Sequence, residues 1–312
     1  MPLSPVILAC LLTASSPGQT DTARSLPAAG VSVLTAASAS IGGLVEGHST
    51  RLAPLGSLWE VHQPQESPEA GVAAGDDGGQ RSADEIAREL ASPNTPLASP
   101  TFKNQYRWYT GDLPHADEQS NYTLLFQPSF PFSLGSTAGG GSQTLFVRPA
   151  FPLLIEQPVF DLTSLDFGAV TALGDIGFDI GYGVTEKNGV LWALGMVGTI
   201  PTATDSDVAG GQLRLGPEAL LAKFEKWGVY GVFPSHQWDV AGWNDEAYST
   251  SQVQLFLTFL PGDGWSIGST PILNYDWISE EWTVPLNLTV TRTVHFAGIP
   301  WKIGVEANYY VE

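Results

Sequence analysis

The chain of 312 residues has few aromatic residues in its first part, one cysteine and no long apolar run. Trp59 is the only aromatic residue among the first hundred, so this part has little with which to build a hydrophobic core. A single cysteine, Cys10, excludes a disulfide framework within one chain and a cysteine-based metal site. The longest aliphatic run, Val6 to Leu12, is far shorter than the ~18–20 residues of a spanning helix. A membrane crossing by this chain must therefore use strands.

Basic residues are scarce as well. The sequence has 13 Lys and Arg against 32 Asp and Glu, which gives a formal net charge of −19. Binding to nucleic acid needs clustered Lys and Arg, so we expect no nucleic-acid partner. Asp205 and Asp207 lie in an acidic loop without the full oxygen-ligand set of a calcium site, and we expect no metal and no cofactor.

The N-terminal part has the composition of a leader followed by a linker. Residues 1–39 are assigned to a signal or leader region, with Ala37-Ser38-Ala39 as a small-residue cleavage site. Residues 40–100 are rich in Pro, Gly, Ala and acidic residues, which is typical of a flexible linker. One short helix is expected near 83–91, because Ser82 and Glu85 form a capping-box pattern.

Residues 101–312 alternate between apolar and polar residues. From Trp282 to Thr291, the residues of one parity are Trp, Val, Leu, Leu and Val, and those of the other are Thr, Pro, Asn, Thr and Thr. Successive side chains of a strand point to opposite faces, so this segment is a strand with one apolar and one polar face. Eleven such stretches are approximately 102–110, 122–131, 143–151, 174–185, 190–200, 213–224, 228–241, 251–260, 265–277, 282–294 and 301–311. Many are close to the ~9–11 residues that a tilted strand needs to cross a bilayer.

The fold class that follows is all-β: an antiparallel transmembrane β-barrel of about 12 strands, preceded by a low-complexity N-terminal segment. Short connections at 186–189, 225–227, 261–264 and 297–300 alternate with longer acidic ones, as in bacterial outer-membrane barrels. Two connections fit this alternation badly: 133–142 is long for a turn, and 279–281 is short for a loop. Such barrels close with an even number of strands, so 11 stretches imply a C-terminally truncated barrel that lacks its closing strand after Glu312.

Parity also assigns the lumen. The charged residues expected on the polar inner face are Arg107, Arg148, Asp175, Asp179, Arg214, Glu218, Asp276, Lys302 and Glu306. Four basic groups against five acidic ones indicate a salt-bridged interior, and about twelve strands leave a narrow or partly occluded passage. Asp175 and Asp179 lie ~13 Å apart along one strand at ~3.3 Å per residue, too far for a glycosidase pair. They favour either a cation-preferring lumen or ion pairing with Arg148, and we prefer the latter.

The outer face is expected to carry the aromatic residues. Trp residues near strand ends, which share the parity of the aliphatic residues, would form girdles at the headgroup level; they are Trp192, Trp265, Trp277, Trp282 and Trp301. In a soluble protein the same parity would be core. The two possibilities differ in whether Leu257, Leu286 and Leu288 face outward or lie in a dry interior.

We expect no enzymatic activity. Ser235 and His236 are neighbours on a strand and therefore point to opposite faces, which prevents a nucleophile–base couple. The sequence also has no Gly-x-Ser-x-Gly nucleophile elbow.

Several phrases between residues 100 and 312 resemble a known family. They are Tyr109 to Pro114, Tyr122 to Pro128, Leu215-Gly216-Pro217, Gln237-Trp238, Asp263-Gly264-Trp265, Trp282 to Leu286 and Tyr309-Tyr310. The chain is similar in these phrases to predicted outer-membrane proteins labelled "MetA-pathway of phenol degradation", often misnamed neuromedin U. The resemblance implies a barrel that moves aromatic or other hydrophobic compounds, and family members continue past the Tyr-Tyr position with a further strand.

The function expected from residues and resemblance together is a passive transporter or channel for small, including hydrophobic or aromatic, molecules. Its place would be the outer membrane of a Gram-negative-type bacterium, with the lipid bilayer and the barrel-assembly machinery as partners. The alternative is a secreted soluble β-sandwich or barrel that binds a ligand such as a carbohydrate, which explains the prolines inside strand stretches more easily.

Overall fold

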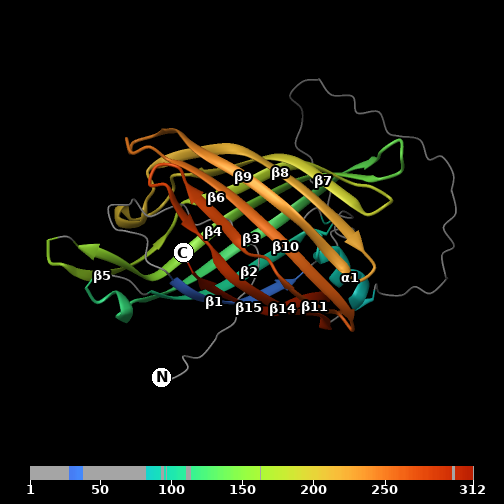
Figure 1. Cartoon of the computed structure of the whole chain (residues 1–312), viewed down its shortest axis with the longest axis horizontal. Coiled ribbons are helices and arrows are strands. Elements are labelled where there is room, and N and C mark those ends of the chain that lie inside the picture. Colours follow the sequence, from blue (N-terminus) through green and yellow to red (C-terminus); the bar gives the residue numbers. More distant parts are fainter. Residues whose placement is uncertain are drawn as a thin grey trace, which may run out of the picture.

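The computed structural model describes residues 28–37, 82–92, 95, 97–109, 114–161, 163–296 and 299–311. In this part of the chain almost everything is antiparallel β-structure wound into a barrel with strongly tilted strands (Figure 1). The strands are β1 (Ala28–Ala37), β2 (Ser99–Tyr109), β3 (Ser120–Ser136), β4 (Ser142–Asp161), β5 (Asp166–Leu173), β6 (Ile176–Thr185), β7 (Val190–Ile200), β8 (Gln212–Glu225), β9 (Gly228–Gly242), β10 (Ser249–Gly262), β11 (Trp265–Ser269), β12 (Ile272–Asp276), β13 (Glu281–Thr283), β14 (Pro285–Phe296) and β15 (Ile299–Tyr310).

Helical structure is sparse. It consists of α1 (Ala83–Leu90) and the 3-10 turns η1 (Ala116–Glu118) and η2 (Ser206–Val208). Among the described residues, these helices are all too short or too polar to cross a bilayer. The expected capping box is present in α1: Ser82 accepts a hydrogen bond from the Glu85 N–H, and the Glu85 carboxylate accepts one from the Ser82 N–H.

Strand pairing runs round a full ring. Consecutive strands pair from β1 through β4, then from β6 through β10; β11 pairs with both β10 and β14, β14 pairs with β15, and β15 pairs with β1. We call each position that is occupied by one strand, or by two successive strand segments, round the barrel a stave. β11 and β12 together form one stave, as do β13 and β14, and β5 is not counted because it pairs only with β4. The wall therefore has twelve staves. The expected number of strands is therefore confirmed.

The twelfth stave lies where the sequence did not indicate it. We expected a closing strand to be missing after Glu312, and we assigned residues 1–39 to a leader. Instead, β1 lies between β15 and β2, with Val33 opposite Val305 on one side and opposite Asn104 on the other. The position of the expected missing strand is thus filled by a segment from upstream of the linker, which corrects this part of the prediction.

Prolines coincide with interruptions of the wall. Pro271 lies between β11 and β12, and Pro285 begins β14 after the break at Val284. In β3, the pairing with β4 lapses between Phe126 and Phe130, around Pro128. Proline has no N–H to give to a ladder, so interrupted pairing is expected at these positions. The prolines are therefore compatible with a barrel wall.

Connection lengths separate the two ends of the barrel. β3 and β4 extend further than expected, which shortens the connection between them to residues 137–141 and removes one of the two misfits. The turns that follow β3, β6, β8, β10 and β14 define the turn end. Longer connections, together with the projecting β4–β5 hairpin, define the loop end. In Figure 1, α1 lies at the turn end and β5 at the loop end.

The outer surface of the wall is apolar. Leu257, Leu286 and Leu288 are 53%, 62% and 50% exposed, so they point outward and not into a dry interior. Trp265, Trp277 and Trp282 are exposed near strand ends, and Tyr275 packs against the last two, with ring centroids 4.9 and 4.8 Å away. Trp192 and Trp301 are only partly exposed. The inward parity, in contrast, is polar over much of the strand length.

Candidate functional site in the barrel interior

Most of the charged residues that parity placed inside are buried there. Arg148, Asp175, Arg214, Glu218 and Glu306 are all at most 5% exposed. Asp179 and Lys302 are half-buried, as are Arg107 and Asp276. The structure divides these nine residues among separate groups along the barrel axis, and it brings three of them together.

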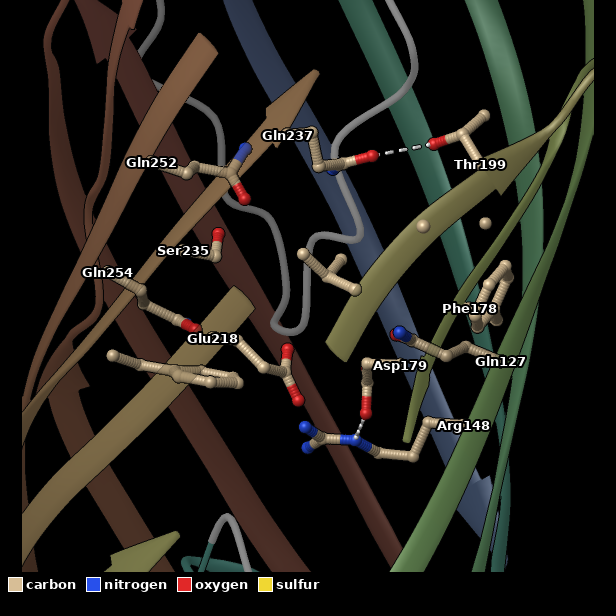
Figure 2. Close-up of a pocket in the computed structure, with 14 residues that line it drawn as sticks. Gln127, Arg148, Phe178, Asp179, Thr199, Glu218, Ser235, Gln237, Gln252 and Gln254 are labelled. Atoms are coloured by element: carbon tan, nitrogen blue, oxygen red, sulfur yellow. Dashed lines mark hydrogen bonds and ion pairs between the residues drawn. The ribbon is translucent and has the colours of Figure 1, made fainter. Parts of the chain in front are cut away.

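The central group is Arg148, Asp179 and Glu218. Arg148 on β4 and Asp179 on β6 are directly opposite in the strand register, and Arg148 Nε lies 2.6 Å from Asp179 Oδ1. For Asp179, but not for Asp175, this is the ion pairing with Arg148 that we preferred over a cation-preferring lumen. Glu218 on β8 points toward the same pair in Figure 2. Its Oε1 is buried and has no hydrogen-bond partner among the described residues.

Lys103 belongs to the same region, although the parity assignment overlooked it. It is 0% exposed, on β2, and its Nζ donates a hydrogen bond of 2.9 Å to Gln127 Oε1 on β3. It shares the inward parity of Arg107, so the sequence pattern already contained the signal that identifies it. Lys103 and Arg148 thus lie in the same part of the lumen as Asp179 and Glu218.

Asp175 lies at the loop end of the barrel, where it binds backbone groups. It precedes β6 instead of lying within it, and its carboxylate accepts hydrogen bonds from the backbone N–H groups of Thr202, Ala203 and Gly210 at 2.8–2.9 Å. It therefore folds the 201–211 loop over the lumen. Asp175 is thus buried at the loop end, apart from the central group.

Arg214 extends this closure of the loop end. Its guanidinium lies 3.8 Å from the Tyr248 ring centroid and donates a hydrogen bond to Gln212 Oε1. Gln212 in turn donates to the Glu246 carbonyl. Loops 201–211 and 243–248 are also tied to each other, since the Trp243 N–H donates to the Gly211 carbonyl.

The remaining charged residues have local partners. The Arg107 guanidinium donates to Gln105 Oε1 on its own strand. Glu306 Oε1 accepts hydrogen bonds from Asn287 and Asn308 at 2.8 Å each. Asp276 caps the turn after β12 by accepting from the Ile278 and Ser279 N–H groups, so it is a turn residue and not a lumen-lining one.

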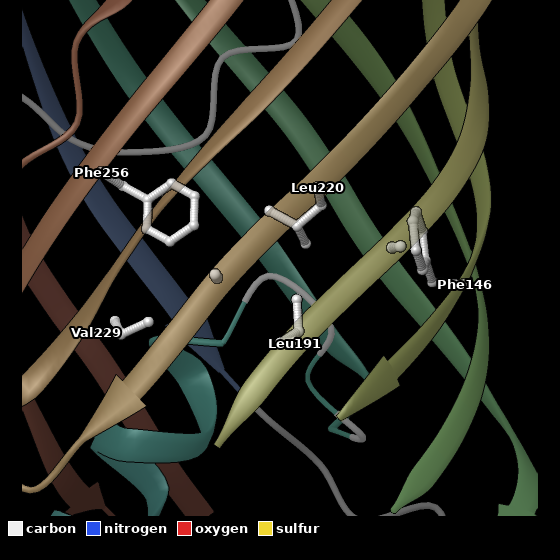
Figure 3. Close-up of a cluster of buried hydrophobic side chains, with 7 residues drawn as sticks. Phe146, Leu191, Leu220, Val229 and Phe256 are labelled. Atoms are coloured by element: carbon white, nitrogen blue, oxygen red, sulfur yellow. The ribbon is translucent and has the colours of Figure 1, made fainter. Parts of the chain in front are cut away.

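The turn end of the interior is closed by apolar side chains and by α1, which sequence parity did not indicate. A buried cluster consists of Phe146, Leu191, Ala193, Leu220, Ala222, Val229 and Phe256, all on strands of the wall (Figure 3). The helix α1 lies beside this cluster, and the residue after it, Ala91, packs against the cluster. The interior therefore changes from polar to apolar toward the turn end.

Hydrogen bonds to the turn-end backbone hold α1. Arg88 donates to the carbonyls of Glu225 and Lys226 at 2.8 and 2.9 Å, and Asp84 accepts from the Gly264 N–H. Lys302 on β15 donates to the carbonyl of Leu90. The segment that we expected to be linker thus contributes a plug to the barrel.

Between these two ends, the interior contains a cavity that is lined by both polar and apolar side chains, the latter including Phe178, Val197 and Phe233. It leaves about 50 Å³ for the centres of water-sized molecules, and it is bounded by strands β3, β4 and β6 to β10. Its polar lining includes the Arg148–Asp179 pair and Glu218 together with Gln127, Thr199, Ser235, Gln237, Gln252 and Gln254 (Figure 2). The sequence analysis did not single out the four glutamines, which are inward-facing residues of three different strands.

Ser235 and His236 point to opposite sides of β9, as expected. Ser235 lines the cavity, whereas His236 Nδ1 lies 2.7 Å from the Ser251 hydroxyl and its ring packs on Trp238 at 4.2 Å. Ser251 also accepts a hydrogen bond from the Trp277 indole N–H. Among the described residues, no carboxylate hydrogen-bonds to His236, so this pair is not part of an acid–base–nucleophile triad. No group of three potential metal ligands is found in the described part of the chain.

Comparisons with known proteins give no relative. The chain matches no family model, no curated protein and no solved structure.

Proposed function

We propose that this chain is an outer-membrane β-barrel of a Gram-negative-type bacterium and that it lets small molecules pass passively. The observation that carries the proposal is the inverted polarity of the wall. Large apolar side chains such as Leu194, Leu257 and Leu286 are more than half exposed, while Lys103, Arg148 and Glu218 are buried inside. This is the arrangement that a lipid-facing exterior and a hydrated interior require.

A soluble barrel accounts poorly for this surface. Exposed contiguous apolar patches of more than a few hundred Å² are rare on soluble monomers. Here exposed Leu, Phe, Met, Ile, Tyr and Trp side chains occur on most staves of the wall. The soluble ligand-binding alternative therefore needs a covering partner, whereas a bilayer covers the whole circumference at once. We accordingly name the lipid bilayer and the barrel-assembly machinery as partners.

Passage through this barrel is restricted. Loops 201–211 and 243–248 cover one end, and α1 with the apolar cluster covers the other. A passive conduit of this kind conducts only when one of the covers moves. Hydrophobic or aromatic solutes are the cargo that the family resemblance implies, and the polar part of the cavity lining indicates that a solute also meets hydrogen-bonding groups.

Reconstitution in planar bilayers tests the proposal directly. The full chain, refolded in detergent, is expected to migrate faster on unheated gels than after boiling and to give discrete conductance steps. Protein boiled before reconstitution is the matched control. A folded protein that stays in the soluble fraction of cells without detergent, and that gives no conductance or solute flux, would refute the proposal.

A further inference from the structure

The central cavity has the size of a small solute. A water molecule needs ~10–15 Å³ of such centre-accessible volume, so about 50 Å³ corresponds to roughly three to five waters. Three to five waters occupy ~90–150 Å³ of liquid at ~30 Å³ each, which is the volume of a solute of three or four carbon atoms with their substituents. A larger ring would have to leave part of itself outside the cavity.

The hydrogen-bonding groups that remain free around the cavity are mixed in kind. Gln127 and Gln237 use their carbonyl oxygens to accept from Lys103 and Thr199, which leaves their amide N–H groups as donors. Gln252 uses its N–H to donate to Asn274, which leaves its oxygen as an acceptor.

Three further groups add to this mixture. Glu218 is 5% exposed and adds an unpartnered acceptor, and Figure 2 shows its carboxylate directed into the cavity. The side chains of Ser235 and Gln254 make no hydrogen bonds to other described residues, and each offers both a donor and an acceptor.

A ligand that satisfies all of these groups must donate and accept at closely spaced positions. Hydroxyl groups do both, whereas an ammonium group only donates and a carboxylate only accepts. Leaving a buried polar group unpaired costs free energy, so a ligand that lacks either donors or acceptors would bind poorly.

The charges around the cavity favour a neutral ligand. Arg148 and Asp179 form an ion pair, and the charge of Lys103 also acts on Asp179. Within the ion pair, the charges of Arg148 and Asp179 compensate each other. A cationic or anionic ligand would disturb this balance in a region of low dielectric constant.

We propose that the cavity between β3 and β10 binds a small neutral polyol of three or four carbons, or the hydroxyl-bearing part of a sugar. This inference rests on the proposed function, because it names the class of solute that the conduit takes. Glu218 and Gln252 are the acceptors for the hydroxyl groups, and Gln127 and Gln237 are the donors. The Arg148–Asp179 pair fixes one side of the cavity without needing the ligand for neutrality.

The test uses the full chain refolded in detergent micelles. Binding of erythritol, n-butylammonium and phenol is measured by saturation-transfer NMR titration. Gln237→Leu removes a donor and Gln252→Leu removes an acceptor on a different strand, and each is expected to weaken erythritol binding about fivefold, the effect of one net hydrogen bond. Glu218→Gln keeps an oxygen at the site and is expected to weaken it less. Thr291→Val changes a buried inner position on β14 outside the cavity and is the control that leaves binding unchanged.

Faster gel migration before boiling shows for each variant that it has folded. Tighter binding of n-butylammonium than of erythritol, abolished by Glu218→Gln, would overturn the inference in favour of a cation site. Tighter binding of phenol, or erythritol binding unaffected by either glutamine substitution, overturns it as well.

Solute entry into proteoliposomes separates the two proposals. Vesicles that exclude every solute although erythritol binds refute the conduit alone. Entry governed only by solute size, without erythritol binding, refutes the polyol site alone.

Discussion

Substitution of Leu194 by Arg tests whether the outside of the wall meets lipid. Leu194 is 62% exposed and is the fifth of the 11 residues of β7, with Tyr182 and Ala219 opposite on the neighbouring strands. At ~3.3 Å per residue and a tilt of ~45°, a strand of this length has a height of ~25 Å, the height of the apolar band of an outer-membrane barrel. Leu194, one residue from the centre of the strand, then lies ~2 Å from the midplane.

The expected cost follows from this depth. Arg at the midplane of the lipid-facing surface costs ~2–4 kcal/mol, and ~3 kcal/mol is about a 150-fold change in the folding equilibrium. In water, a substitution at a position so exposed changes stability by no more than ~0.5 kcal/mol. The two environments therefore predict effects that differ several-fold.

Leu165 provides the matched control. It has the same residue type and nearly the same exposure, 59%, but it lies in the turn between β4 and β5 at the loop end, beyond the wall. Unfolding by guanidinium in phospholipid vesicles, followed by tryptophan fluorescence, is expected to show a loss of ~3 kcal/mol for Leu194→Arg and little change for Leu165→Arg. Equal, small effects of the two substitutions would refute the lipid-facing assignment.

Three further perturbations address the closing strand, the plug and the ion pair. Val33 and Val305 are opposite in the β1–β15 register, so cysteines placed at both positions, in a protein without the native cysteine, are expected to cross-link on oxidation. The cross-link is detected by gel mobility, and its absence in folded protein would contradict the position of β1. Arg88→Ala removes two hydrogen bonds that hold α1 and is expected to raise single-channel open probability in planar bilayers; unchanged or lower conductance would exclude α1 as the moving cover. Arg148→Met leaves buried carboxylates unpaired and is expected to cost ~3–5 kcal/mol in guanidinium unfolding, with partial recovery when Asp179→Asn is added; no recovery would contradict the pairing.

The strands of the wall could be predicted from the sequence because the residues of each strand alternate between apolar ones, which face outward, and polar ones, which face inward. In β14, Leu286 and Leu288 are exposed while Thr289 and Thr291 are buried, as the alternation of the sequence predicts. This inference needs only the period of two and no knowledge of neighbours. The helix α1 was predictable for a similar reason, since its capping box is a local feature.

Features that depend on distant partners were not predictable. The small residues of β1 are as compatible with a leader as with a strand, and only the open edges of β2 and β15 decide between the two. The docking of α1 depends on a contact between Asp84 and Gly264, which are 180 residues apart. Parity gives the face of the wall on which a side chain lies, but not its height along the barrel. For this reason Asp175 and Asp179 seemed equivalent in the sequence and have different roles in the structure.

The proposed conduit would open at the part of the barrel that is held most weakly. The pairing of β2 with β3, for example, extends over ten positions. Separating two such strands within lipid would leave their backbone N–H and C=O groups without hydrogen bonds, at a cost of several kcal/mol each. By contrast, α1 is held by four hydrogen bonds, from Arg88 twice and through Asp84 and Lys302, each worth ~0.5–1.5 kcal/mol net. Ile86 and Ala87 are its buried apolar residues. Displacement of α1 therefore costs far less than separation of any two staves. In the proposed conduit, a solute would therefore pass at the turn end, where α1 is displaced and the apolar side chains of the wall must also shift, and not through the wall.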